Sequence, residues 1–84
     1  MNLKTLLNGI EYEGNADVEI TSVECDSRKV QKGSAFVCIK GYETDGHIYA
    51  KQCEEKGAGV IIAEDDIDVS CPVVKVKDTR KVLA

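Results

Sequence analysis

The spacing of hydrophobic and polar residues changes repeatedly along the chain, and each change predicts a boundary between short secondary-structure elements. Leucines recur at helical spacing within residues 2–9, which predicts a short amphipathic helix that Asn2 can cap. Residues 10–17 show no sustained period. We interpret them as a connector with room for a brief strand at 10–12.

Further segments have the composition of β-strands. Residues 18–23 alternate between apolar and polar side chains and are rich in β-branched residues, which favours a strand that ends before Cys25. Residues 35–39 and 59–63 contain no polar side chain, a pattern typical of strands buried on both faces. Residues 72–76 form the last predicted strand, after an acidic loop.

The second half of the chain also contains the pattern of two helices. The first follows a glycine-flanked loop and ends at Gly57, and its buried stripe is predicted to consist of Ile48, Tyr49, Gln52, Cys53 and Lys56. The second covers residues 79–84 and is capped by Asp78. We interpret it as the start of a helix that continues in a longer parent chain.

The order of buried strand, helix and buried strand predicts an α/β fold, with a small mixed sheet flanked by helices. A right-handed crossover is expected between the strands at 35–39 and 59–63. A chain of 84 residues is long enough for one small hydrophobic core. We therefore expect residues 1–84 to form a single domain.

Charge and hydropathy argue against several classes of function. The formal net charge is −4, whereas general binders of nucleic acids or anionic membranes need a clustered basic surface. The apolar runs fall far short of the roughly 20 residues that a membrane-spanning helix needs. The amino terminus also lacks the apolar stretch of a secretion signal. We expect a cytoplasmic protein with no nucleic-acid or membrane partner.

The cysteine pattern predicts neither a zinc site nor a disulfide scaffold. Cysteine occurs at four widely spaced positions, without a Cys-x-x-Cys pair, and the chain has one histidine. We interpret Cys25, Cys38, Cys53 and Cys71 as reduced thiols in a reducing compartment, most of them packed as small hydrophobic side chains. No metal site is predicted.

The first candidate binding loop is Cys25-Asp26-Ser27-Arg28, which follows the predicted strand at 18–23. Open α/β sheets bind ligands beyond the carboxyl ends of their strands. The Ser27 hydroxyl can hydrogen-bond to a uracil or a ribose, and Arg28 can pair with a phosphate. The alternative is an ordinary Asx turn with a solvated Arg28.

The second candidate loop follows the strand at 35–39. Its glycines permit close approach of the backbone, and the helix that follows offers free N–H groups to an anion. The alternative is a loop in which an aspartate caps the helix and the histidine lies on the surface. The candidate binding residues of this loop are Tyr42, Glu43, Thr44, Asp45, Gly46 and His47.

The spacing between the two loops adds a stronger signal than either loop alone. The run comprises Asp26-Ser27-Arg28, Val30, Gly33, Phe36-Val37, Lys40-Gly41, Thr44-Asp45-Gly46-His47 and Gly57-Ala58. In this order and at these intervals it resembles the N-terminal domain of the Mur ligases. These are ATP-dependent amide ligases that extend the peptide of the peptidoglycan precursor, and the resemblance covers nearly the whole chain.

The resemblance implies that this domain holds the uridine diphosphate end of the substrate UDP-MurNAc-L-Ala-D-Glu. By position, the contacts fall on Cys25 and Ser27 and on residues 42–44. Cys25 stands where the family has an aliphatic residue, which leaves open whether its side chain or its backbone takes part.

The resemblance also implies a branch and a parent enzyme. The pattern is most similar to the branch that adds a diamino acid, diaminopimelate or lysine, and the branch that adds D-alanyl-D-alanine is the alternative. A phosphate loop of the form GxxxxGK(S/T) does not occur in the sequence. ATP and magnesium are therefore expected in a central ATP-binding domain of the same parent chain, and residues 1–84 alone are expected to be inactive. A stand-alone nucleotide-binding module is the second hypothesis.

Overall fold

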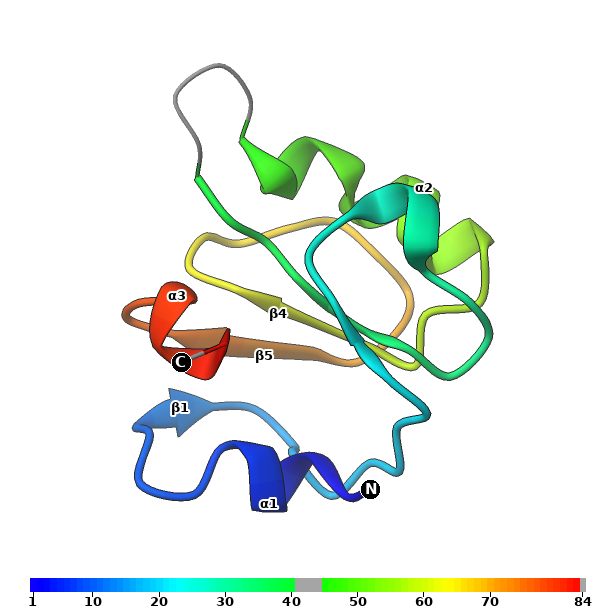
Figure 1. The fold of residues 1–84 in the computed structure, drawn as a ribbon. Helices are drawn as coiled ribbons and strands as arrows, with labels where there is room; N and C mark the ends of the chain where they lie inside the picture. The colour runs from blue at the N-terminus through cyan, green and yellow to red at the C-terminus, as the bar shows by residue number, and fades with distance from the viewer. Residues whose placement is uncertain (41–44, 84) are drawn as a thin grey trace.

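The computed structural model describes residues 1–40 and 45–83. Figure 1 shows a central sheet with short helices packed around it. In chain order the elements are α1 (Leu3–Leu6), β1 (Tyr12–Glu13), β2 (Val23–Glu24), the 3-10 helix η1 (Ser27–Lys29), β3 (Ala35–Val37), the 3-10 helix η2 (Gly46–Tyr49), α2 (Ala50–Glu55), β4 (Val60–Ala63), β5 (Val73–Val76) and α3 (Arg80–Leu83).

The sheet is mixed, as the sequence predicts. Its strand order is β1-β5-β4-β3-β2, in which β2 to β5 run parallel and β1 pairs antiparallel with β5 at one edge. The parallel strands β3 and β4 are joined through α2, which confirms the predicted order of strand, helix and strand. The carboxyl ends of four strands therefore lie at one edge of the sheet, here called the carboxyl edge.

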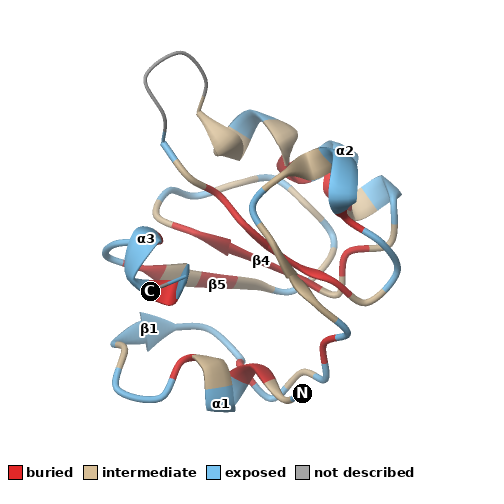
Figure 2. Ribbon diagram, viewed as in Figure 1, coloured by how far each residue is buried: buried red, intermediate tan, exposed pale blue. Residues whose placement is uncertain are grey.

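The central strands β3 and β4 are buried on both faces, which confirms the interpretation of the apolar runs at 35–39 and 59–63. Every residue of β3 and β4 is buried (Figure 2). One face packs against a cluster that includes Leu3 of α1 and Val82 of α3. The opposite face packs against Cys53 and Ala50 of α2.

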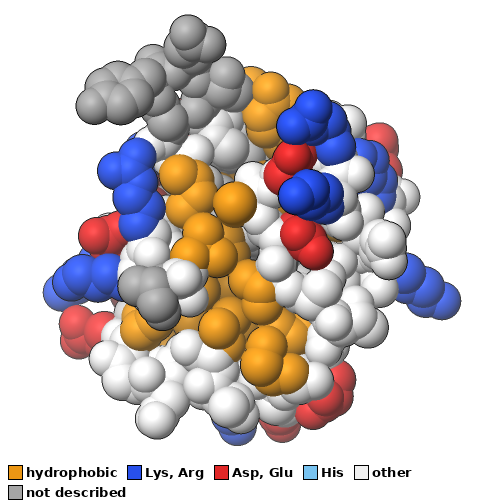
Figure 3. All heavy atoms as spheres, viewed as in Figure 1, with side chains coloured by type: hydrophobic (Ala, Val, Ile, Leu, Met, Phe, Trp, Pro, Cys, Tyr) orange, Lys and Arg blue, Asp and Glu red, His pale blue; other side chains and the backbone are white. Residues whose placement is uncertain are grey.

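The first of these faces is only partly covered. Val23 and Ile39 are among the partly buried hydrophobic residues that pack against its cluster. Leu83 of α3 is 44% exposed. On the face seen in Figure 3, hydrophobic side chains form a band across the molecule, with charged side chains on both sides.

The strand predicted at 18–23 is wrong over most of its length, because only Val23 of that segment belongs to β2. The backbone before it is bonded to other partners. Leu3 donates to the Val18 carbonyl oxygen over 2.9 Å, and Ile20 donates to that of Met1 over 2.8 Å. The alternating pattern thus fits an extended segment paired with the amino terminus rather than a longer strand of the main sheet.

The helix before Gly57 begins differently from the prediction. Its first turns form the 3-10 helix η2, and the α-helical part starts only at Ala50. Because a 3-10 helix has about three residues per turn, the predicted stripe does not stay on one face. Ile48 is 68% exposed, whereas Ala50 and Cys53 are buried.

The predicted caps are confirmed. Lys4 donates its amide hydrogen to Asn2 Oδ1 over 2.9 Å at the start of α1. At the start of α3, Arg80 donates its amide hydrogen to Asp78 Oδ1 over 3.0 Å. In the part of the chain that the structure describes, no helix is long and apolar enough to cross a membrane.

All four cysteines are free thiols, in agreement with the interpretation of the sequence. Cys38 and Cys53 are completely buried. Burial raises the pKa of the Cys38 thiol to about 12, so this thiol is protonated at neutral pH and behaves as a small hydrophobic side chain.

Ile62 in β4 and Ile48 in η2 differ in burial, so the same substitution at the two positions tests the described packing. Ile62→Ala removes a completely buried side chain and is expected to lower the free energy of unfolding by about 2–5 kcal/mol. Ile48→Ala makes the same chemical change at an exposed position and is expected to stay within about 0.5 kcal/mol of the unchanged protein. Urea unfolding of the two variants measures both effects. Equal losses would contradict the described packing of η2.

Candidate functional site

Polar loops gather at the carboxyl edge because four parallel strands end there. β2 leads into the turn at 25–28, β3 into the segment that precedes η2, β4 into Glu64 and Asp65, and β5 into residues 77–80. Segments that are far apart in the sequence thus become neighbours, as Figure 1 shows.

A pocket of about 560 Å³ lies between the turn after β2 and the start of the helix after β3. We call it the Ser27 pocket. One wall comes from the first candidate loop, and the other comes from the end of β3, η2 and α2. Its lining residues are Cys25, Asp26, Ser27, Arg28, Ile39, Gly46, Tyr49 and Gln52.

The first loop is an Asx turn that continues into η1, as its alternative interpretation states. Asp26 Oδ1 accepts hydrogen bonds from the Arg28 amide at 2.9 Å and from Arg28 Nε at 3.0 Å, and Asp26 Oδ2 accepts one from Arg28 Nη2 at 2.9 Å. These bonds from Arg28 lower the pKa of the Asp26 carboxyl to about 2. The Arg28 side chain remains 86% exposed.

Ser27 is held in the pocket wall through its backbone. Its carbonyl oxygen accepts a hydrogen bond of 2.8 Å from Lys56 Nζ, which ties the turn to the end of α2. The Ser27 hydroxyl makes no hydrogen bond to any other residue that the structure describes, so it is available to a ligand. Ser27 can therefore belong to the Asx turn and still offer its hydroxyl to a ligand.

The second candidate loop is described from Asp45 onward, and the predicted contacts Tyr42, Glu43 and Thr44 lie outside the described residues. Asp45 caps η2 by accepting the amide hydrogen of His47 over 2.9 Å. His47 Nδ1 also bonds to Asp45 Oδ1. The cap is therefore confirmed, but the alternative of a surface histidine is wrong, because the His47 side chain is only 8% exposed.

Gly46 is required by close packing of the backbone. A Cβ atom at this position would lie 2.7 Å from the Ile39 nitrogen and 3.0 Å from its carbonyl oxygen. The Gly46 amide donates to that oxygen over 2.8 Å. The close approach at Gly46 is therefore to the protein's own backbone, and Gly41 lies outside the described residues.

The expectation that the start of this helix offers free N–H groups to an anion is wrong for the described residues. The Gly46 amide donates to Ile39, the His47 amide to the Asp45 carboxylate, and the Ile48 amide to the Asp45 carbonyl oxygen over 3.1 Å. Asp45 consumes two of these donors. Asp45 thus caps η2 by accepting amide hydrogens that a phosphate at this helix start would need.

Tyr49, Gln52 and Ile39 line the Ser27 pocket although sequence reasoning did not select them. Tyr49 is the last residue of η2, and Gln52 follows three residues later in α2. The sequence pattern places both residues in the buried stripe of a single helix, so their position at the pocket was not predicted.

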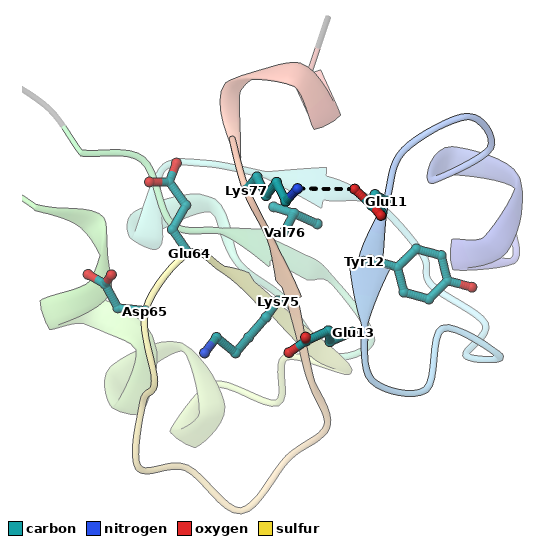
Figure 4. A pocket seen from close by; sticks show the side chains of 8 residues that line it. All are labelled: Glu11, Tyr12, Glu13, Glu64, Asp65, Lys75, Val76 and Lys77. Carbon is teal, nitrogen blue, oxygen red and sulfur yellow. Dashed lines mark ion pairs between the residues drawn. The ribbon is translucent and has the colours of Figure 1, made fainter.

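A second hollow, which we call the Lys75 pocket, has a volume of about 520 Å³ and lies beside β1 and β5. In Figure 4 the Glu13 and Asp65 carboxylates lie on either side of the Lys75 side chain. Lys77 pairs with Glu11 over 3.3 Å. Four carboxylates and two lysines line this hollow, so it repels a diphosphate more strongly than the Ser27 pocket, where Asp26 and Arg28 balance.

Asp45, His47 and Asp65 could offer metal ligand atoms within 4.8 Å of one another. Both imidazole nitrogens of His47 are already engaged. Nδ1 bonds to Asp45, and Nε2 accepts the amide hydrogens of Glu64 and Asp65 at 3.0 and 3.2 Å. The geometry therefore favours a hydrogen-bonded link between two loops over a metal site.

In α/β folds, a polar pocket beyond the carboxyl ends of parallel strands is a common position for a small-ligand site. Comparison with known protein families shows to which family the chain belongs. The chain belongs to the Mur ligase family, because the family model described as "Mur ligase family, catalytic domain" matches residues 19–84.

Curated relatives carry a shared name, UDP-N-acetylmuramoyl-L-alanyl-D-glutamate–2,6-diaminopimelate ligase. The protein from Bacillus licheniformis is 51% identical over 82 residues, which cover 98% of this chain and 17% of that protein. The protein from Clostridium botulinum is 48% identical over 91 residues, which cover 100% of this chain and 19% of that protein. The chain thus spans less than a fifth of the length of these relatives.

Solved structures of Mur ligases share the fold. A crystal structure of MurF from Acinetobacter baumannii superposes with a TM-score of 0.80 at 30% identity, covering 98% of this chain and 18% of that chain. MurF from Thermotoga maritima in complex with ADP superposes with a TM-score of 0.71 at 30% identity, covering 80% of this chain and 16% of that chain.

The lowered pKa of the Asp26 carboxyl predicts how the stability of the folded state depends on pH. A carboxyl whose pKa is lower in the folded state stabilises that state above its ordinary pKa, and this contribution is lost as pH falls through the folded value of about 2. The Asp26 carboxyl carbon, followed by NMR, should titrate near pH 2. In Arg28→Ala the midpoint should rise toward the ordinary range of aspartate. An unchanged midpoint would show that Arg28 does not hold this carboxylate.

Proposed function

We propose that this domain binds the uridine diphosphate end of UDP-N-acetylmuramoyl-L-alanyl-D-glutamate in the Ser27 pocket. The observation that carries the proposal is the position of this pocket, at the carboxyl edge of a parallel sheet in a member of the Mur ligase family. The names of the curated relatives, which include this nucleotide-linked peptide, support the choice of ligand.

The lining of the pocket suits a uridine better than a free phosphate. Ile39 and Tyr49 offer apolar surface to a base, while the Ser27 hydroxyl and the Gln52 amide can hydrogen-bond to polar edges of a uracil or ribose. Arg28 is exposed at the same pocket and has donors beyond those that Asp26 uses, so it can approach a phosphate.

Several contacts in the proposal rest on the family resemblance alone. These are Tyr42, Glu43 and Thr44, which lie outside the described residues. We keep Asp45, Gly46 and His47 in the proposed site as residues that shape it, and no longer as donors of amide hydrogen bonds to a phosphate. Gly46 lines the pocket, and Asp45 and His47 shape its wall. Cys25 also lines the pocket, through a side chain or backbone contact.

We further propose that the parent chain is an ATP-dependent amide ligase that joins 2,6-diaminopimelate to the D-glutamyl residue of this substrate in the cytoplasm. Identities of 51% and 48% to the diaminopimelate ligases above support this branch. The alternative is the ligase that adds D-alanyl-D-alanine, which the likeness to MurF supports at 30% identity. The higher identities favour diaminopimelate.

ATP and magnesium do not fit the residues described here. The sequence contains no phosphate loop, and the amides at the start of η2 are consumed within the protein. In this proposal both belong to a central domain of the parent chain, which is also the partner of this domain. The 84-residue chain alone then has the role of an anchor, whose binding energy positions a distant carboxylate for reaction, and it turns over no ATP.

Ser27→Ala tests the proposed pocket directly. Loss of one neutral hydrogen bond is expected to weaken binding of UDP-N-acetylmuramic acid by about 0.5–1.5 kcal/mol, measured by titration calorimetry with the 84-residue chain. Ser70→Ala, at an exposed position in the loop after β4, is the matched control and should bind as the unchanged chain does. Equal affinity of all three proteins would assign Ser27 a structural role only.

Gly46→Val and Lys40→Ala separate shape from charge. A side chain at Gly46 would collide with the backbone of Ile39, so Gly46→Val should abolish measurable binding of the nucleotide sugar. Lys40 is already paired with Asp65 over 3.0 Å, so Lys40→Ala should change the affinity by less than about threefold. Titrations at two salt concentrations check this. A large, salt-dependent effect of Lys40 with a silent Gly46 would show that side-chain charge holds the diphosphate.

A further inference from the structure

We propose that His47 is a positioning residue, which fixes one wall of the Ser27 pocket by accepting two backbone hydrogen bonds at Nε2 from the end of β4. The inference rests on the proposed function, because it concerns the wall against which the nucleotide would bind. His47 itself does not line the pocket, whereas Gly46 and Tyr49, on either side of it in η2, do.

The contacts of the imidazole determine its protonation pattern. Nε2 faces the amide hydrogens of Glu64 and Asp65, at 3.0 and 3.2 Å, and can only accept them. In the neutral ring the hydrogen then resides on Nδ1, where it is donated to Asp45 Oδ1. Asp45 also accepts the His47 amide hydrogen. The ring is therefore fixed at both ends, to its own helix and to the neighbouring strand end.

The far side of this link is also fixed. Glu64 Oε2 accepts hydrogen bonds of 3.0 Å from both the amide and the hydroxyl of Thr79. Thr79 is completely buried, and it directly precedes α3. His47 thus connects η2 to a strand end that is itself bonded to another element.

Two other contacts also hold η2, because Gly46 donates its amide hydrogen to Ile39 and Tyr49 packs against the core cluster beside α2, but the bonds to the end of β4 come from His47. η2 has four residues, and short 3-10 helices have weak hydrogen-bond geometry of their own. Ile48 is 68% exposed and adds little burial. Loss of the acceptor at Nε2 would leave two backbone amides without that partner and would free the pocket wall to move.

Two substitutions distinguish the acceptor from the rest of the side chain. In His47→Gln the amide oxygen can occupy the place of Nε2, whereas the shorter side chain of His47→Asn reaches only the place of Nδ1. We expect His47→Asn to weaken binding of UDP-N-acetylmuramic acid about tenfold and His47→Gln by less than about threefold. Asp66→Asn is the control, since it breaks an exposed ion pair with Lys75 in the same loop.

The experiment combines titration calorimetry, urea unfolding and hydrogen exchange of the Glu64 and Asp65 amides by NMR, all with the 84-residue chain. The inference predicts faster exchange of these two amides in His47→Asn, slow exchange in His47→Gln, and binding that follows the same order. Unchanged binding in His47→Asn would overturn the inference and leave the proposed function intact. The inference would also be overturned if His47→Asn and His47→Gln lost binding equally and their urea midpoints fell to the same extent. No binding by the unchanged chain would overturn the proposed function together with it.

Discussion

The parallel pairing of β2 to β5 is the constraint on which the rest of the structure depends. Parallel strands of this length are held in place by burial on both faces, and here α1 and α3 cover one face while α2 covers the other. Such pairing sends the loops after four strands to a single edge. The carboxyl edge therefore contains the Asp26 turn, the start of η2 and the acidic segment after β4, which come from separate parts of the chain.

Polar contacts at this edge mostly satisfy the protein itself. Asp26 holds Arg28, and Asp45 accepts the amide hydrogen of His47 in η2. His47 then links η2 to the end of β4. What these contacts leave is a pocket with apolar surface on Ile39 and Tyr49 and a Ser27 hydroxyl that bonds to no other residue among 1–40 and 45–83. The Asp26 and Asp45 carboxylates at this edge are thus engaged by Arg28 and His47, so that an acidic domain does not present them as free charges beside the pocket.

The sequence predicted most of the sheet because β-branched runs such as 59–63 report burial directly. The strand at 18–23 failed because alternation shows only that a segment is extended, and its partner turned out to be the amino terminus. The first candidate loop was found from its side chains. The role of His47 could not be found in that way, because its partners are the backbone amides of Glu64 and Asp65. A backbone donor that is distant in sequence leaves no signal in residue types.

The central claim is that the Ser27 pocket, and not the Lys75 pocket, receives the nucleotide end of the substrate. The most direct test is an NMR titration of the isotope-labelled 84-residue chain with UDP-N-acetylmuramic acid. Our account predicts that the largest amide shifts fall on residues 25–28 and on Gly46, Tyr49 and Gln52, which line the Ser27 pocket. Shifts concentrated on Glu11, Glu13 and Lys75, which line the other hollow, would contradict it.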